Sequence, residues 1–147
     1  MQKSRQVKEL ILLDTHIWIW LVNGDRRVSS SKFLNLINRM AESSGIRVSV
    51  ISVWEVGMLE SKGKISLPYS CLEWVQRALR SPGISLVPLT PEIAIESSRL
   101  PGTFHGDSAD RILIATARDL GASLVTEDGY ILAYSRENSI HTISPKF

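Results

Sequence analysis

Short apolar runs alternate along the chain with longer segments in which apolar residues recur every third or fourth position. The short runs predict strands at residues 9–13, 47–51, 84–89, 123–126 and 140–143, and the first of them suits a strand buried on both faces of a parallel sheet. The helical spacing predicts helices at residues 17–21, 33–40, 52–59, 72–79, 91–100, 107–120 and 130–134. Strands separated by helices require crossovers, so the pattern predicts an α/β fold: a three-layer sandwich with a mostly parallel central sheet flanked by helices.

Capping residues predict where several of these helices begin and end. Thr90 followed by Pro91 is a clean helix start, and glycines predict helix ends at Gly45 and Gly121. Ser52 and Glu55 have the spacing of a capping box, with serine as N-cap. Pro88 confines the run 84–89 to an edge strand or ends it.

Composition indicates an ordinary globular chain. Its 147 residues, 44% of them apolar, predict one domain over residues 1–147. The longest apolar stretch, residues 11–22, is interrupted by Asp14 and His16, so no membrane segment is expected, and residues 1–6 do not resemble a signal peptide. The single cysteine, Cys71, excludes an internal disulfide, is expected in the core, and fits a cytoplasmic protein. The net charge of +2 does not by itself indicate a nucleic-acid partner.

Acidic residues follow the predicted strands. Asp14 comes after the first strand, Glu55 lies one turn into the helix after the second, and Asp128 follows the strand 123–126. Asp107 and Asp110 open the helix that precedes that strand, and residues three apart share a helix face. Ligands of open α/β sheets bind beyond the carboxyl ends of the strands. We therefore expect these acids to meet at one edge.

Two interpretations of the acids remain open at this point. Asp, Ser and Glu are common helix caps, so each acid has a structural explanation of its own. Alternatively, carboxylates without histidine or thiolate partners suit Mg²⁺ or Mn²⁺, and such an ion binds phosphate, activates water and relieves the repulsion between the acids. No glycine-rich P-loop is present, so binding of a nucleoside triphosphate is not indicated.

An ordered set of motifs resembles the PIN-domain ribonucleases, in particular VapC-type toxins of bacterial toxin–antitoxin pairs. The resemblance extends from about residue 10 to residue 143, and it rests on LLDTH at 12–16, SVWEV at 52–56, KGKISLP at 62–68, LP at 100–101, HGDSADRILIA at 105–115 and LVTED at 124–128. It implies a PIN-like fold and a Mg²⁺- or Mn²⁺-dependent endoribonuclease. It also implies a homodimer whose acidic groove is blocked by the tail of a cognate antitoxin protein.

The resemblance also implies roles for the acids. Asp14 and Asp110 would hold the ion directly, and Glu55 and Asp128 would complete its shell or hold a second ion. Water activated by the metal would displace the 3′ oxygen of the RNA. Asp107 is a secondary member of the site, where Ser108 stands in place of the proline common in relatives.

Other residues near the acids are weaker candidates. The hydroxyls of Thr15 and Thr126 lie beside acids in the sequence and are expected to orient them. His105, Arg111 and His16 are possible RNA contacts, although a surface ion pair or a backbone contact explains Arg111 as well, and loop hydrogen bonding or packing explains the histidines. Core or dimer packing, rather than base stacking, is the preferred role for three of the four tryptophans: Trp18, Trp20 and Trp54.

Two other classes of function remain. A Mg²⁺-dependent phosphatase-like hydrolase on a similar sheet would turn over small phosphate esters, but a haloacid-type enzyme would need a second aspartate where His16 stands. A non-catalytic binding module would keep the acids as helix caps only.

Overall fold

A computed structural model describes residues 8–146 of the chain. Its centre is a five-stranded, wholly parallel sheet, which confirms the predicted α/β fold. The strands lie in the order β3-β2-β1-β4-β5 and span Ile11–Leu13 (β1), Ile46–Ser49 (β2), Ile84–Val87 (β3), Ser123–Val125 (β4) and Thr142–Ile143 (β5). The N-terminal residues 1–6, for which no signal peptide is expected, lie outside the described part.

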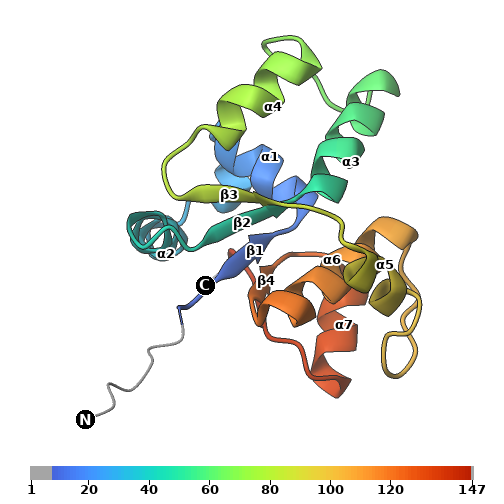
Figure 1. Ribbon diagram of the computed structural model, residues 1–147. Helices are drawn as coiled ribbons and strands as arrows, with labels where there is room; N and C mark the ends of the chain where they lie inside the picture. The colour runs from blue at the N-terminus through green and yellow to red at the C-terminus, as the bar shows by residue number, and fades with distance from the viewer. Residues whose placement is uncertain (1–7, 147) are drawn as a thin grey trace.

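Helices cover both faces of the sheet and complete three layers, as predicted. Figure 1 shows α1, α3 and α4 on one side and α5, α6 and α7 on the other. Alternation along β1 sends Ile11 and Leu13 into the first layer and Leu12 into the second. The helices are Thr15–Asn23 (α1), Arg26–Val28 (η1, a 3₁₀ turn), Ser31–Glu42 (α2), Val50–Ser61 (α3), Cys71–Leu79 (α4), Pro91–Ser97 (α5), Ser108–Leu120 (α6) and Gly129–Glu137 (α7).

Two predicted caps are wrong. Helix α3 begins at Val50, because the Ser49 side chain accepts a hydrogen bond from the Ile51 amide and ends β2 there. Ser52 is therefore a buried residue of the first turn and not the N-cap, so Glu55 closes no capping box. Helix α2 ends at the C-cap Ser43 rather than at Gly45. A side chain at Gly45 would collide with Met40 and the Glu9 carbonyl, which explains that glycine.

Other boundaries are confirmed. Thr90 caps α5 with Pro91 in its first turn, and Gly121 ends α6 in the left-handed conformation. Strand β3 ends immediately before Pro88 and lies at an edge of the sheet. Cys71 is only partly buried and packs against the first layer, at the start of α4 rather than deep in the core. Within residues 8–146, no helix has the length and apolarity needed to cross a bilayer.

The sheet order places a switch point at its centre. From β1 the chain first builds outward through β2 and β3, and later adds β4 and β5 on the opposite side of β1. The carboxyl ends of β1, β2 and β4 run directly or within a few residues into α1, α3 and α7. Such a point opens a crevice at the carboxyl edge of the sheet. Because all five strands run in the same direction, residues 14, 49–55 and 126–128 lie at one edge of the sheet.

Candidate active site

Asp14 lies at the centre of this edge. It follows β1 directly, caps α1, and is only 7% exposed. Its Oδ1 accepts a hydrogen bond from the Thr15 amide at 2.7 Å, and its Oδ2 accepts one from Thr126 Oγ1 at 2.6 Å. Its own amide donates to the Val125 carbonyl. The carboxylate is therefore fixed between the ends of β1 and β4.

Thr126 connects Asp14 to the next acid along the chain. The hydroxyl of this fully buried threonine donates to Asp14 and accepts from the Asp128 amide at 3.0 Å. Asp128 caps α7, where its Oδ1 accepts a hydrogen bond from the Ile131 amide. The predicted orienting role of Thr126 thus has a structural basis, because one hydroxyl bonds both to the Asp14 carboxylate and to the Asp128 backbone.

Thr15 does the same for Glu55 on the other side. Its Oγ1 donates to Glu55 Oε1 at 2.6 Å and lies 2.8 Å from Ser52 Oγ. Since the Thr15 proton goes to the carboxylate, the Ser52 hydroxyl donates to Thr15. Sequence reasoning missed this role of Ser52, because it placed the residue at the helix cap. The hydrogen bonds among Thr15, Ser52 and Glu55 join α1 to α3 and hold Glu55 at the carboxyl edge of the sheet.

Asp107 and Asp110 have the unequal positions that the sequence predicts. Asp107 is the exposed N-cap of α6, and its Oδ1 accepts from the Asp110 amide at 2.9 Å. Asp110 lies in the first turn, partly buried. Gly106 is needed beside it, because an added Cβ would strike the Phe104 ring and lie 3.1 Å from Asp110 Oδ2.

These acids surround one cavity of about 370 Å³. Among residues 8–146, no lysine or arginine lines it, and its walls are formed by Asp14, His16, Ile17, Trp20, Glu55, Asp107, Asp110, Glu127 and Asp128. Glu127 is an addition to the predicted set. Its Oε1 is buried and has no hydrogen-bond partner within residues 8–146. Its only sequence signal was its position next to Asp128.

Burial and mutual repulsion raise the pKa values of three of these carboxyl groups. The pKa of Asp110 rises to about 8, first through burial and then through the charges of Asp107, Asp128, Asp14 and Glu55. Burial raises the pKa of Asp14 despite the hydrogen bonds from Thr126 and Thr15. Burial likewise raises the pKa of Glu55, with Asp14 and Asp107 adding to the effect. The cavity therefore holds more negative charge than its surroundings compensate.

The donor chemistry of the cavity fits a hard divalent cation. Its acidic side chains offer only carboxylate oxygens, the ligands preferred by Mg²⁺ and Mn²⁺, and a cation would relieve their repulsion. Within residues 8–146, no three His, Cys, Asp or Glu side chains already form a metal-binding group. Several of the carboxylate oxygens instead bond to helix amides and threonine hydroxyls. Binding an ion would require these side chains to close on it.

The three candidates for RNA contact lie in different places. His16 is exposed on α1, with its ring centre 5.9 Å from that of Trp20, and lines the acidic cavity. His105 lines a separate cavity beside Tyr130. Arg111 donates to the carbonyl oxygens of Ser97 and Phe104, which is the backbone contact weighed as an alternative for this residue.

Comparisons with known proteins agree with this geometry. Residues 11–137 match the PIN domain family. Ribonuclease VapC22 of Mycobacterium tuberculosis is 31% identical over 118 residues, which cover 80% of this chain and 86% of that protein. The chain belongs to the PIN-domain family and, within it, to the VapC-type ribonucleases.

Solved structures show the same fold at lower identity. The crystal structure of DNA-bound VapBC from Salmonella typhimurium matches with a TM-score of 0.69 and 15% identity, covering 94% of this chain and 99% of that one. VapBC2 from Rickettsia felis, bound to a DNA fragment from its promoter, matches with a TM-score of 0.67 and 16% identity, covering 92% and 98%. At these identities the similarity supports the fold alone.

Proposed function

We propose that this chain is a Mg²⁺- or Mn²⁺-dependent endoribonuclease that acts as the toxin of a toxin–antitoxin pair. The observation that carries the proposal is the cavity at the switch point of the sheet, where six acids meet and no lysine or arginine of residues 8–146 is among the lining side chains. Such a site attracts a divalent cation, and through the cation it attracts the phosphate of a nucleic acid. Membership of the VapC-type ribonucleases makes RNA the substrate of choice.

Four carboxylates would hold the cation. Asp14 and Asp110 are the direct ligands in this proposal, and Glu55 and Asp128 complete the shell. When bound, the ion would polarise the phosphodiester, make water a better nucleophile and neutralise charge on the departing oxygen. Asp107 would fix Asp110 through the helix cap that it forms with the Asp110 amide.

The protein's own groups supply positioning and proton balance. Thr126 holds Asp14 and the Asp128 backbone, and Thr15 holds Glu55, so each acid keeps one orientation. Without a cation, the raised pKa of Asp110 leaves its carboxyl group largely protonated at neutral pH. Cation binding would release that proton, because the charged form is the ligand.

Helix capping alone does not explain the acids. Asp14, Asp107 and Asp128 do cap helices. Glu55 caps nothing, since Ser49 caps α3, and the pKa of Asp110 is raised rather than lowered. An acid whose only task was to stabilise a helix end would not be placed where burial and four other carboxylates oppose its charge. This favours the enzyme over the binding module.

Asparagine substitutions test the proposal. Asn caps helices as well as Asp, so Asp14→Asn should fold normally. We expect Asp14→Asn and Asp110→Asn each to slow cleavage of single-stranded RNA by about three orders of magnitude, because metal catalysis supplies several kcal/mol. Asp119→Asn is the matched control, because Asp119 is an exposed acid of α6, the helix that carries Asp110, and this variant should cleave RNA normally. Wild-type rates in either site variant would refute the assignment, and turnover of p-nitrophenyl phosphate without RNA cleavage would favour a phosphatase.

We also propose the biological setting that goes with this activity. The whole chain, residues 1–147, forms a single PIN domain that acts on RNA in the cytoplasm, dimerises, and is inhibited by a cognate antitoxin. Similar folds are found in crystal structures of VapBC from other bacteria, which supports a search for a partner encoded beside this gene. Co-expression with the neighbouring short reading frame should abolish cleavage and yield a stable complex, and sedimentation should give the mass of two chains for the free protein.

A further inference from the structure

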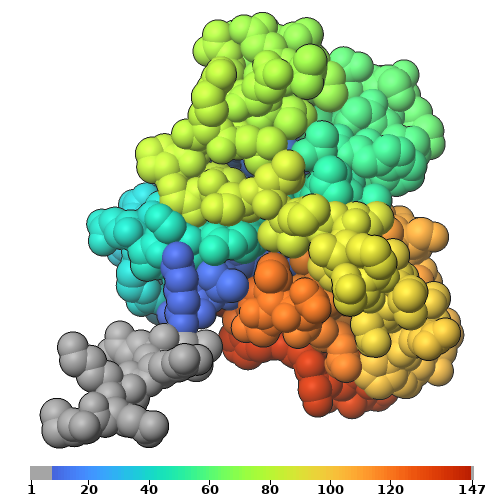
Figure 2. Space-filling model, viewed as in Figure 1, coloured from blue at the N-terminus to red at the C-terminus, as the bar shows by residue number. Residues whose placement is uncertain are grey.

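A second cavity adjoins the acidic one. It measures about 340 Å³ and lies between α3 and the start of α6. Glu55 and Asp107 line both cavities, so the two form one continuous surface. Figure 2 shows α3 and α4 (green to yellow-green) projecting beyond the α5–α6 part of the molecule, and α3 carries the wall of this groove.

Trp54 is the most prominent side chain of the groove. It precedes Glu55 on α3 and is 54% exposed, whereas Trp18 and Trp74 are buried and pack edge to face. Trp20 is covered by the guanidinium of Arg27. The packing role expected for Trp54 therefore does not apply within this chain. Met58, Leu59 and Ala109 add apolar surface beside the indole ring.

Two lysines border the same groove. Lys62 and Lys64 are exposed, and neither is among the ion pairs of residues 8–146. Their backbones are fixed, because the Lys62 amide donates to Met58, the Lys64 amide donates to Leu59, and Gly63 turns the chain with φ 70°. The groove thus combines acids shared with the first cavity, an aromatic ring, apolar side chains and two lysines on one surface.

We propose that this groove binds one nucleotide of the RNA adjacent to the cleaved phosphate, with its base stacked on Trp54 and its phosphate beside Lys62 and Lys64. The inference rests on the proposed function. Aromatic rings with neighbouring cations are how proteins hold single-stranded nucleic acids without reading their sequence. The acids would receive the cleaved phosphate through their cation, and the lysines would receive the next phosphate directly.

Charge favours RNA over a second protein copy in the groove. Four of its nine lining residues are charged: Glu55, Lys62, Lys64 and Asp107. The buried centre of a protein interface is depleted in charged side chains, and lysine is among the least favoured there. A nucleotide matches both parts of the groove, because its base is flat and apolar on its faces and its phosphate is anionic.

RNA binding without cleavage is the decisive measurement. The full chain in a chelator is titrated into a fluorescent single-stranded RNA of about 12 nucleotides, with binding followed by anisotropy. We expect Trp54→Ala to weaken binding about tenfold and Trp54→Phe to stay within about threefold, since phenylalanine keeps a stacking face. Tyr69→Ala is the control, because Tyr69 is a partly exposed aromatic residue outside the groove.

Salt dependence tests the lysines separately. Lys62 and Lys64 share one phosphate, so replacing both by alanine should reduce the magnitude of the slope of log K against log salt by about 0.7, the value for one phosphate contact on a single strand. Lys32→Ala, at an exposed lysine of α2 away from the groove, should leave the slope unchanged.

Three results would overturn the subsite. The first is unchanged RNA binding by Trp54→Ala, and the second is no measurable RNA binding by the wild-type chain. The third is a wild-type dimer that Trp54→Ala converts to a monomer in sedimentation, which would mean that a second copy covers Trp54. Failure of the proposed function has a different signature: Asp14→Asn would cleave normally while binding still depended on Trp54. The two hypotheses can therefore fail independently.

Discussion

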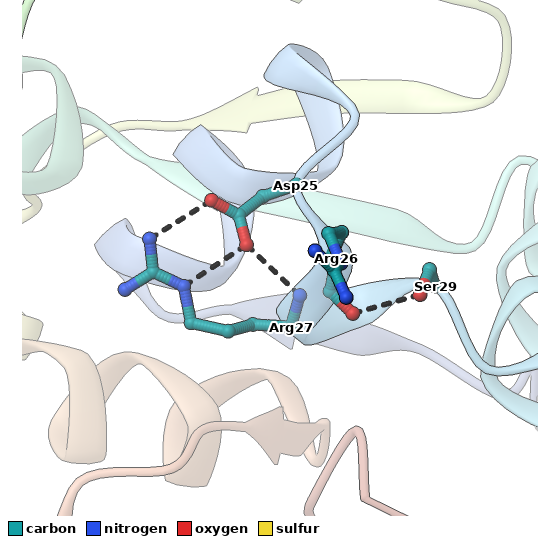
Figure 3. A network of polar contacts seen from close by, with 4 residues as sticks. All are labelled: Asp25, Arg26, Arg27 and Ser29. Atoms are coloured by element: carbon teal, nitrogen blue, oxygen red, sulfur yellow. Dashed lines mark hydrogen bonds and ion pairs between the residues drawn. The ribbon is translucent and has the colours of Figure 1, made fainter.

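Two regions of this molecule use capping aspartates in opposite ways. Asp25 caps the 3₁₀ turn η1, and its carboxylate accepts from the Arg27 amide, from Nε at 2.9 Å and from a terminal nitrogen at 2.8 Å (Figure 3). These bonds lower the pKa of Asp25 to about 2. Asp14 also caps a helix, yet burial raises its pKa, and no arginine or lysine in the described part of the chain lines the cavity around it.

Capping a helix therefore does not by itself decide whether the pKa of a carboxyl group is raised or lowered. Both aspartates accept a backbone hydrogen bond, but within residues 8–146 only Asp25 forms an ion pair with an arginine. In the cavity the missing positive charge has to come from outside, as a metal ion or a proton.

The largest effect is expected from adding a divalent cation. Mn²⁺ at about 100 times its dissociation constant should stabilise the folded chain by about 2.7 kcal/mol, which corresponds to a rise in Tm of about 5 to 10 °C. Calorimetry should show no such rise for Asp110→Asn and a normal rise for Asp119→Asn. An equal rise in the Tm of Asp110→Asn would mean that the ion binds elsewhere. The acids of the cavity would then not need a cation from outside, and the contrast with Asp25 would be refuted.

Removing the Thr126 hydroxyl should have the next largest effect. Thr126→Val leaves Asp14 Oδ2 without its donor and the Asp128 amide without its acceptor, so the free energy of unfolding should fall by about 1–3 kcal/mol. Thr116→Val is the control: this buried hydroxyl donates only to the Ile112 carbonyl of its own helix. Urea unfolding of both variants compares them, and equal losses would show that the cavity network adds nothing special.

A pH effect of smaller size follows from Asp110. Its carboxyl group keeps a proton up to about pH 8 in the folded chain, but only up to its usual pKa of 3.8 when unfolded. Between these values the folded state binds more protons, so stability decreases as the pH rises. Because Asp110 is partly exposed, solvent screening reduces the loss to about 1 to 2 kcal/mol. Metal-free wild-type chain should therefore melt lower at pH 8 than at pH 5.5.

Asp110→Asn supplies the comparison for this measurement. Asparagine does not titrate, so the decrease of Tm over the same pH range should shrink in this variant. A wild-type chain whose Tm rises from pH 5.5 to pH 8 without metal would contradict the direction assigned to Asp110.

The smallest effect is expected at Asp25. Asp25→Asn keeps a good N-cap but loses the charged pair with Arg27, and exposed pairs contribute little to stability. The Tm should change by about 2 °C or less, as followed by circular dichroism. A decrease as large as that of Thr126→Val would mean that the exposed pair and the buried network are equivalent, contrary to the comparison above.

The fold class and five of the six acids that line the cavity could be predicted from local sequence patterns. Continuous apolar runs favour strands, and all five strands were located, so the parallel sheet could be predicted. The edge strands β3 and β5 are nevertheless partly exposed. Because parallel strands end at a common edge, Asp14, Glu55 and Asp128 could be expected to meet there. Local capping chemistry placed Thr90 and Asp107 correctly. The roles of Asp14, Glu55, Asp110 and Asp128 as metal ligands remain predictions.

How these residues act on one another depends on contacts between distant parts of the chain, which the structure shows. Ser49, rather than Ser52, caps α3, because both serines suit a cap locally and the end of β2 selects between them. Ser52, Thr15 and Glu55 interact across up to 40 positions in the chain, which no local pattern records. The exposure of Trp54 and the unpaired Glu127 oxygen were also unpredictable. Burial and charge depend on what the rest of the chain packs nearby, whereas periodicity is written into neighbouring residues.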